Sequence, residues 1–392
     1  MSDQKLPLSQ ETRSLALASP GVRRMFERGR ELAARYGADA IADLSLGNPD
    51  LPVPPELTEA LVAVAQEARH GYLPNAGLPE LRRTLADRAA RESRRPVTAE
   101  GVVVTVGAAG GLAIALRALL DPGDEVILFS PYFSEYPLYV RLAGGCPVVA
   151  EGDREHLPDP EALRAAITPR TRAVILDNPN NPSGSLADAE RLARLAAVLD
   201  AAEQPIWLIS DEPYADIVFD GLRTPPVLDA FTNVIVVRSW SKTLSIPGER
   251  IGAVLVPADV PAFPELMTNL IFANRALGFV HAPAIWQRVL ARVPDLAVDP
   301  APYERRRNRL TELVRAAGLD VVTPRGAFYL FPAVPGDDQV FAELAAAQRL
   351  LVVPGSSFGR PGHVRMAYCV ADEVIERAGT CLARVMKELP HE

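Results

Sequence analysis

Lysine is scarce in this chain of 392 residues, in which lysine and arginine together number 41 but only three are lysines. Lys5 and Lys387 lie near the two ends, so Lys242 is the one interior lysine. Arginine replaces lysine as a surface charge, but its guanidinium stays protonated and cannot act as an amine nucleophile. Lys242 is therefore a candidate for amine chemistry such as Schiff-base formation. A compositional bias against lysine that spared one residue by chance is the alternative that the count leaves open.

Cysteine is equally scarce, and long apolar runs are absent from the sequence. The cysteines, Cys146, Cys369 and Cys381, show no paired spacing, so neither a disulfide framework nor a zinc site is expected, and we predict no metal. The first residues lack the apolar stretch of a signal peptide, and no run reaches the length of a membrane helix. We therefore expect a cytoplasmic protein without a membrane partner.

Basic residues do not outnumber acidic ones, and the formal net charge is -8. Binding to nucleic-acid phosphates needs a basic face, so nucleic acid is not expected as a partner. Hydrophobic residues make up 48% of the chain and charged residues 23%, which is typical of a soluble globular protein.

Short β-rich runs alternate with helical patterns through the middle of the chain. Several runs are almost wholly apolar, as expected for a sheet that is covered on both faces. The expected strands are residues 102–106, 125–129, 146–149, 172–177, 206–210, 233–238 and 251–256. With helical patterns such as 111–120 and 188–202 between them, they predict an α/β fold with a mostly parallel seven-stranded sheet sandwiched by helices.

Helical patterns also flank this block on both sides. They cover residues 20–36, 55–69 and 78–92 before it, and 302–317 and the stretch from 371 after it, with short strands near 328–331 and 364–367. We predict a large domain over residues 46–285 and a smaller α+β domain over 286–392, which the N-terminal segment 1–45 joins.

Polar and small residues follow several of the expected strands, where ligands bind in α/β sheets. They are the glycine-rich stretch 107–111, Asn181 in an Asn-Pro loop, Asp211 with Tyr214, and the stretch from Ser239 to Arg250. Each has an ordinary alternative, such as a tight turn or a helix cap. Together they place an amine, a carboxylate, an amide and phosphate donors at successive strand ends.

This order of motifs resembles the fold type I pyridoxal-phosphate enzymes, specifically the class I/II aminotransferase family. The resemblance spans roughly residues 20 to 388, and its Ser-x-Ser-Lys and Asn-Asn-Pro-x-Gly motifs are specific. The matching stretches are residues 45–50 (SLGNPD), 71–82, 130–137, 178–184 (NPNNPSG), 210–214 (SDEPY), 239–242 (SWSK), 247–252 (PGERIG), 326–331 (GAFYLF) and 353–358 through Arg365.

The resemblance implies a catalytic role for three residues. Lys242 would be the Schiff-base lysine that holds pyridoxal 5′-phosphate and then moves the proton at the substrate α-carbon. Asp211 would pair with the pyridine nitrogen and keep it protonated, because a nearby anion raises the pKa of a cation. Tyr214, together with Asn181, would bind the phenolic oxygen of the cofactor ring.

The remaining implied positions bind the cofactor or the substrate. Phosphate donors would come from the backbone of Ala108 and Ala109 and from the side chains of Ser239, Ser241 and Arg250. Phe133 would stack on the pyridine ring, with core packing as its alternative. Substrate α-carboxylate would be held by Arg365, Asn181 and the Gly47 backbone. Tyr72 would reach the phosphate of a partner subunit in a homodimer, and a plain loop tyrosine is the alternative there.

Two positions depart from the family pattern. Phe133 stands where many members carry tryptophan, and Ala109 stands where some aspartate-using relatives carry a lysine for the distal carboxylate of the substrate. Arg275 is another candidate cation, or a surface residue. The leading function is an aminotransferase that moves an amino group between an L-amino acid and a 2-oxo acid by a ping-pong cycle. Another pyridoxal-phosphate reaction, such as β-elimination or side-chain modification, is the alternative, and a cofactor-sensing regulator is a remote one.

Overall fold

The computed structural model describes residues 9–17 and 21–389 of the chain. No helix within these residues is long and apolar enough to cross a bilayer. The helices are α1 (Gln10–Leu17), α2 (Gly21–Tyr36), α3 (Pro55–Gln66), α4 (Pro79–Glu92), α5 (Gly107–Leu119), α6 (Tyr136–Leu142), α7 (Pro160–Ala166), α8 (Ala189–Asp200), α9 (Trp240–Thr243), α10 (Phe263–Ala276), α11 (Ala284–Leu290), α12 (Ala301–Ala316), α13 (Asp338–Ala347) and α14 (Asp372–Glu388).

The strands fall into three sheets within the described residues. A seven-stranded sheet has the order β2-β8-β7-β6-β5-β3-β4, a three-stranded sheet the order β11-β12-β9, and β1 pairs with β10. Their bounds are β1 (Ala42–Asp43), β2 (Val102–Thr105), β3 (Glu125–Ser130), β4 (Cys146–Glu151), β5 (Thr171–Asp177), β6 (Trp207–Glu212), β7 (Val234–Ser239), β8 (Gly252–Leu255), β9 (Tyr329–Leu330), β10 (Leu350–Leu351), β11 (Val353–Pro354) and β12 (Val364–Ala367).

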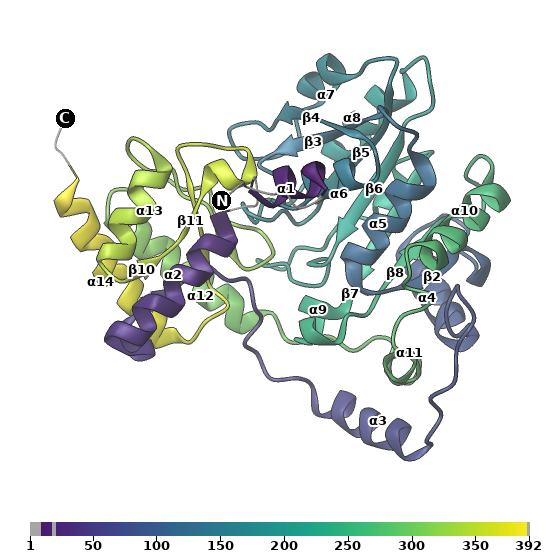
Figure 1. Cartoon of the computed structure of the whole chain (residues 1–392), viewed down its shortest axis with the longest axis horizontal. Helices are drawn as coiled ribbons and strands as arrows, with labels where there is room; N and C mark the ends of the chain where they lie inside the picture. Colours follow the sequence, from purple (N-terminus) through teal and green to yellow (C-terminus); the bar gives the residue numbers. More distant parts are fainter. Residues whose placement is uncertain (1–8, 18–20, 390–392) are drawn as a thin grey trace, which may run out of the picture.

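The large sheet is mostly parallel, because only β8 runs antiparallel to its neighbours. All seven strands that the sequence predicts take part in it, with ends shifted by up to two residues. The predicted α/β class with a mostly parallel seven-stranded sheet is therefore confirmed. Helices cover both faces of the sheet (Figure 1).

Alternate residues of each strand pack into two different apolar cores, as the period of two in a strand requires. In β5, Val174 and Leu176 contribute to the core beneath α4, α8 and α11, whereas Ala173 and Ile175 contribute to the core beneath α5, α6 and α10. Burial on both faces explains why these strands are nearly continuous apolar runs in the sequence.

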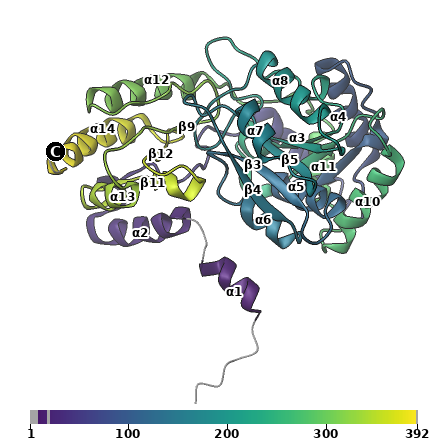
Figure 2. The ribbon, with the colours of Figure 1, turned by 90° about the horizontal axis from the view of Figure 1, so that it is seen from above.

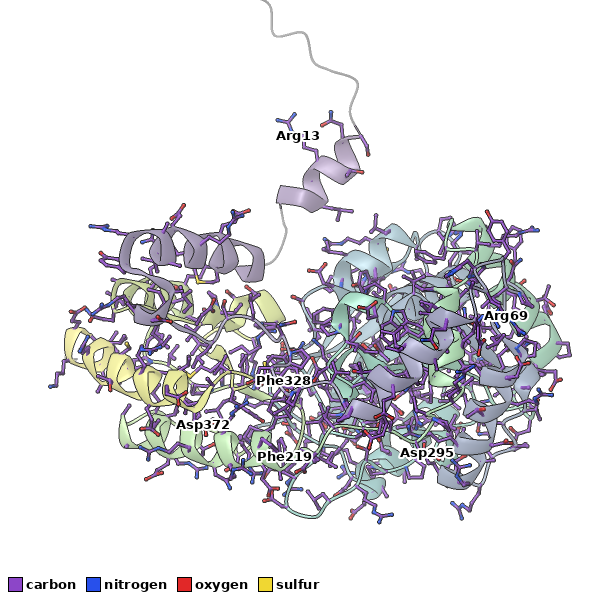
Figure 3. All side chains as sticks on the ribbon, turned by 90° about the horizontal axis from the view of Figure 1, so that it is seen from below. Arg13, Arg69, Phe219, Asp295, Phe328 and Asp372 are labelled. Carbon is purple, nitrogen blue, oxygen red and sulfur yellow. The ribbon has the colours of Figure 1, made fainter. Side chains whose placement is uncertain are left out.

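A third core gathers residues that lie far apart in the sequence. β1, which precedes the large sheet, pairs with β10, and Leu44 packs with residues of α12, α13 and α14. Figure 2 shows α2 beside α13, together with α12 and α14, apart from the large sheet. Phe219 and Phe328 belong to this core. In Figure 3 they lie between the part of the molecule that contains the large sheet and the part that contains α12 and α14. The predicted domain boundaries at residues 45/46 and 285/286 stay a prediction.

One helix begins earlier than the sequence predicts. The expected helix starts at residue 111, after a glycine turn, but α5 begins at Gly107. Alanine is the strongest helix former, so Ala108 and Ala109 add a helical turn in spite of the flanking glycines. The first amides of α5 consequently lie at the carboxyl edge of the large sheet.

Candidate active site

A cavity of about 300 Å³ lies at the carboxyl ends of β5, β6 and β7. Its walls come from the large sheet, from α5 and α6, and from the third core. Among its lining residues are Gly47, Ala108, Ala109, Phe133, Asn181, Asp211, Tyr214, Ser239, Ser241, Lys242, Arg250 and Arg365. The structure thus brings together the predicted catalytic, cofactor-binding and substrate-binding residues except Tyr72, and the candidate cation Arg275 does not line the cavity either.

Lys242 lies in the short helix α9, directly after β7. The hydroxyl of Ser239 accepts the Ser241 amide and so caps α9, which fixes where the lysine leaves the strand. The Lys242 Nζ donates a hydrogen bond of 2.7 Å to the carbonyl of Gly47. Burial lowers the pKa of Lys242 to about 8, and the positive charges of Arg365 and Arg250 also lower it. A much larger fraction of this amine than of an ordinary lysine is therefore neutral and nucleophilic at physiological pH.

Asp211 presents a buried carboxylate at the end of β6. Its Oδ2 accepts a hydrogen bond of 2.7 Å from the hydroxyl of Tyr136. Its Oδ1 is buried and receives no hydrogen bond from any residue that the structure describes. Burial raises the pKa of Asp211 to about 7, and the hydrogen bond from Tyr136 acts in the opposite direction by lowering this pKa. A buried oxygen without a donor is where a ligand cation or N–H group fits.

Donors for an anion gather at the first turn of α5. Gly107 has a φ of 66°, and a Cβ built there would lie 2.8 Å from the Arg250 Nη2, so this turn and the guanidinium pack closely. Arg250 itself has a left-handed backbone, with φ of 53°. Its Nη1 donates to the Pro247 carbonyl at 3.0 Å. A left-handed arginine is strained, and such strain accumulates at binding sites. Free helix amides and a guanidinium together suit a phosphate group.

Arg365 also lines the cavity and is 3% exposed. Its Nη1 donates to Asn181 Oδ1 at 3.1 Å, and its Nη2 donates to the Ser45 carbonyl at 2.7 Å. The rings of Tyr329 and Phe358 flank the guanidinium at 4.6 and 4.8 Å. Its Nε is buried and has no acceptor among the described residues. A buried guanidinium without a paired carboxylate calls for an anionic ligand.

Gly47 and the two tyrosines close the same side of the site. A Cβ at Gly47 would lie 1.9 Å from the Tyr329 Oη, so no larger residue fits without displacement. The hydroxyls of Tyr214 and Tyr329 lie 2.9 Å apart in a hydrogen bond. Burial raises the pKa of Tyr214 well above its usual value, so this tyrosine is a neutral donor.

Comparison with known proteins agrees with this geometry. The family model described as aminotransferase class I and II matches residues 39–381. The chain belongs to this family. It is 37% identical to the aspartate/prephenate aminotransferase of Thermus thermophilus over 90% of this chain and 92% of the relative. An aspartate aminotransferase of Geobacillus stearothermophilus is 34% identical over 92% and 94% of the two chains.

Solved structures of class I and II aminotransferases have the same fold. A crystal structure of an aminotransferase from Eubacterium rectale superimposes with a TM-score of 0.94 at 35% identity, covering 98% of this chain and 99% of the other. The Thermus thermophilus aspartate aminotransferase with maleate gives 0.86 at 32% identity, covering 97% and 100%. Membership in the family confirms the predicted resemblance to class I/II aminotransferases, the predicted pyridoxal-phosphate-dependent aminotransferase activity, and pyridoxal 5′-phosphate as the cofactor.

The residues in the cavity fit pyridoxal 5′-phosphate, which has an anionic phosphate, a basic ring nitrogen and an aldehyde. The first turn of α5 and Arg250 supply phosphate donors, the Oδ1 of Asp211 is open to a ring N–H, and the Lys242 amine suits the aldehyde. Phe133 also lines the cavity and packs edge-on against Tyr136 at 5.4 Å between ring centroids.

Tyr72 stands apart from the other predicted residues. It is 92% exposed, it does not line the cavity, and its ring packs edge-on against His281 at 5.9 Å. Its predicted reach into a partner's site therefore stays a prediction.

Several residues that line the cavity were not predicted from the sequence. They are Leu112, Tyr136, Tyr139, Asp177, Pro213, Pro247 and Tyr329. Tyr136 and Tyr329 lie within stretches that match the family, at 130–137 and 326–331, so the matching stretches were a signal that could have marked them. Asp177 was marked only by being a carboxylate that ends an apolar strand.

Proposed function

We propose that this aminotransferase works by a ping-pong cycle in which Lys242 binds the cofactor covalently and moves the proton at the substrate α-carbon. The observation that carries this proposal is the position of the Lys242 amine, inside the cavity and with its pKa lowered to about 8 by burial. An amine whose pKa lies near physiological pH can both attack a carbonyl and exchange protons there. Bound pyridoxal 5′-phosphate supplies the electron sink for charge at the α-carbon and carries the amino group between the two substrates.

The residues around Lys242 have separate binding tasks in this proposal. Asp211 keeps a negative charge against the ring nitrogen, and the Tyr136 hydrogen bond holds that carboxylate in place. Tyr214 and Asn181 donate to the ring oxygen, and Phe133 packs on the ring. Backbone amides of Ala108 and Ala109, the hydroxyls of Ser239 and Ser241, and the Arg250 guanidinium bind the phosphate.

Arg365 binds the α-carboxylate of the amino acid, with Asn181 and the Gly47 backbone beside it. The hydrogen bonds from Arg365 to Asn181 and Ser45 hold the guanidinium plane before a substrate enters. A preorganised guanidinium loses little entropy when it binds a carboxylate, which favours a productive position of the α-carbon next to Lys242.

We propose further that the distal group of the substrate meets no cation from this subunit. Lysine and arginine side chains that line the cavity are Lys242, Arg250 and Arg365, and each has a role above. Ala109 carries no charge. The relatives are named for aspartate and prephenate, but an acidic side chain would need a cation from a second subunit, for which Arg275 is the candidate. We therefore expect a smaller advantage for aspartate over neutral amino donors than a fixed cation would give.

A single half-reaction tests the function. Purified enzyme with bound cofactor is mixed with one amino donor at a time, and the absorbance of the cofactor is followed without any oxo acid. We expect conversion to the amine form of the cofactor, with release of one 2-oxo acid and no ammonia. Ammonia release without that conversion would instead support the elimination reaction. Comparing aspartate with leucine and phenylalanine in the same assay tests the proposal on the distal group.

The enzyme is proposed to act as a homodimer in which Tyr72 reaches the partner's phosphate site. Large apolar side chains are exposed on α10 and directly after it, Phe272 at 58% and Leu277 at 45%, and a partner would cover them. Tyr72→Phe keeps the ring and removes the hydroxyl, so we expect weaker cofactor binding in an intact dimer. Tyr36→Phe is the matched control at an exposed tyrosine remote from the cavity, and it should bind cofactor as the wild type does. A monomer by light scattering would contradict the proposal.

A further inference from the structure

Two buried carboxylates lie side by side in this site, and only one of them has a task so far. The register of β5 and β6 pairs Asp177 directly with Asp211. Paired residues on neighbouring parallel strands point to the same face, and the strands are about 4.8 Å apart. Both carboxylates line the same cavity, and Asp177 is 8% exposed and Asp211 5%.

Neither carboxylate has a cationic partner in the described part of the chain. Asp177 Oδ2 accepts the backbone amide of Asn181 at 2.8 Å, and its Oδ1 is buried without a donor, as is that of Asp211. The charge of Asp211 acts on Asp177, and Asp177 in turn acts on the phenols of Tyr136, Tyr214 and Tyr329; none of these groups is positive. Glu212 adds a further negative charge near Asp211. Ionising both carboxylates would place two negative charges side by side in a buried site, which is unfavourable, so the pair retains one proton.

The surroundings decide which of the two keeps the proton. Asp211 accepts a short hydrogen bond from the Tyr136 hydroxyl, which favours its ionised form, whereas Asp177 accepts only one backbone amide. Burial and the charge of Asp211 also hold the pKa of Asp177 well above its usual range. Asp177 is therefore the neutral member of the pair.

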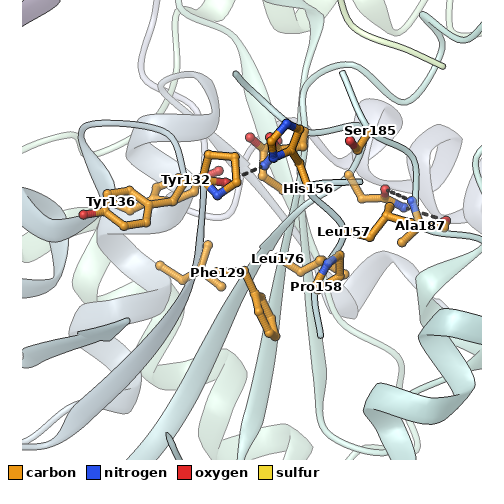
Figure 4. A pocket seen from close by; sticks show the side chains of 14 residues that line it. Phe129, Tyr132, Tyr136, His156, Leu157, Pro158, Leu176, Ser185 and Ala187 are labelled. Carbon is orange, nitrogen blue, oxygen red and sulfur yellow. Dashed lines mark hydrogen bonds between the residues drawn. The ribbon is translucent and has the colours of Figure 1, made fainter. Parts of the chain in front are cut away.

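Asp177 also lines a second, smaller cavity of about 20 Å³, which Figure 4 shows. Tyr136 and His156 line it too, and the His156 Nδ1 is buried without a partner among the described residues. This volume admits about one water molecule, and the polar atoms around it suit one.

We propose that Asp177 is a positioning residue that stays protonated beside an ionised Asp211 and, through the Asn181 amide, aligns Asn181 and Arg365 for the substrate carboxylate. The neutral acid leaves Asp211 as the single negative charge against the ring nitrogen. Its Oδ2 fixes the backbone of Asn181, whose side-chain oxygen in turn accepts from Arg365. This inference deepens the proposed function, and it rests on the roles proposed above for Asp211 and Arg365.

Infrared spectroscopy of the cofactor-free protein tests the protonation directly. Protein labelled with ¹³C at the aspartate carboxyl is compared with unlabelled protein at pH 8, where an ordinary aspartate is ionised. We expect the carbonyl band of a protonated aspartate in the wild type, its loss in Asp177→Asn, and its retention in Asp188→Asn, a control at an exposed helix cap. Absence of the band in the wild type, or its survival in Asp177→Asn, overturns the proposal. Neither result depends on whether the protein transfers amino groups.

Steady-state kinetics of the loaded enzyme test the positioning. Asp177→Leu leaves the Asn181 amide unpaired, and we expect the KM for the amino donor to rise about tenfold with a smaller change in kcat. Asp177→Asn supplies an uncharged acceptor for the same amide and should recover most of that loss. Equal increases in KM for both variants would overturn the positioning role. If Asp177→Leu does not fold, the infrared comparison with Asp177→Asn still decides the protonation.

Discussion

The amine of Lys242 should ionise at a pH well below that of an ordinary lysine. Burial lowers its pKa from 10.5 to about 8, and Arg365 and Arg250 act in the same direction. Each pKa unit corresponds to 1.36 kcal/mol, so the folded protein disfavours the protonated amine by about 3 kcal/mol relative to water. Nearly half of the molecules would carry a neutral amine at pH 8, compared with fewer than about one in a hundred for an ordinary lysine.

The scarcity of lysine makes this shift directly measurable. Protein labelled with ¹³C at the lysine Cε gives only three lysine signals, from Lys5, Lys242 and Lys387. We expect one of these signals of the cofactor-free protein to titrate near pH 8. Loss of that signal in Lys242→Arg assigns it.

Replacing Arg365 separates the two causes of the shift. Arg365→Met removes a positive charge, so the pKa of Lys242 should rise, but it should stay below 10.5 because burial is the larger cause. If no lysine signal titrates near pH 8, the low pKa of Lys242 is wrong, and so is the reasoning from burial. If Arg365→Met restores the ordinary value, charge rather than burial sets the pKa.

Three further predictions concern residues around Lys242. Burial raises the pKa of Asp211 to about 7, so its buried charge costs stability above pH 7 and not below pH 4. Cofactor-free Asp211→Asn should therefore gain up to about 4 kcal/mol in urea unfolding at pH 8 and little at pH 4, and an equal gain at both would refute this. Tyr136→Phe removes the hydrogen bond to Asp211 and should weaken cofactor binding about tenfold at pH 7, measured by fluorescence; unchanged affinity would contradict the role of the bond. Gly47→Ala places a Cβ 1.9 Å from the Tyr329 Oη and should lower the stability, measured by thermal unfolding, by about 1–3 kcal/mol. The same substitution should lower the stability of a Tyr329→Ala variant much less, because the clashing ring is gone.

The sheet was predictable because its strands are buried on both faces. Strands such as β5 and β7 are nearly continuous apolar runs, and helical patterns lie between many of them. The predicted strand ends differ from the observed ends by at most two residues, so the sequence still placed the site residues at the carboxyl edge of the sheet. The predicted start of α5 was wrong by about one turn. Glycines normally disfavour a helix, but the two alanines between them favour one, and α5 begins at Gly107.

The predicted site residues were found through a different kind of signal. Lys242, Asp211 and Asn181 follow strand ends in a fixed order, and their types match the chemistry of one cofactor. The Asp211–Tyr136 hydrogen bond could not be predicted. The sequence does not distinguish Tyr136 from an ordinary core aromatic residue, because the contact depends on how α6 packs against the sheet. The pairing of Asp177 with Asp211 depends on strand order and register, which the sequence pattern alone does not determine.

The central claim is that Lys242 is the residue to which the cofactor is attached. Borohydride reduction of the loaded enzyme, followed by proteolysis and mass spectrometry, locates the attachment among only three lysines. We predict that the added mass lies on the peptide containing Lys242 and that Lys242→Arg, which keeps the positive charge, takes up none. Cofactor mass on Lys5 or Lys387, or a reducible linkage that persists in Lys242→Arg, would contradict the assignment.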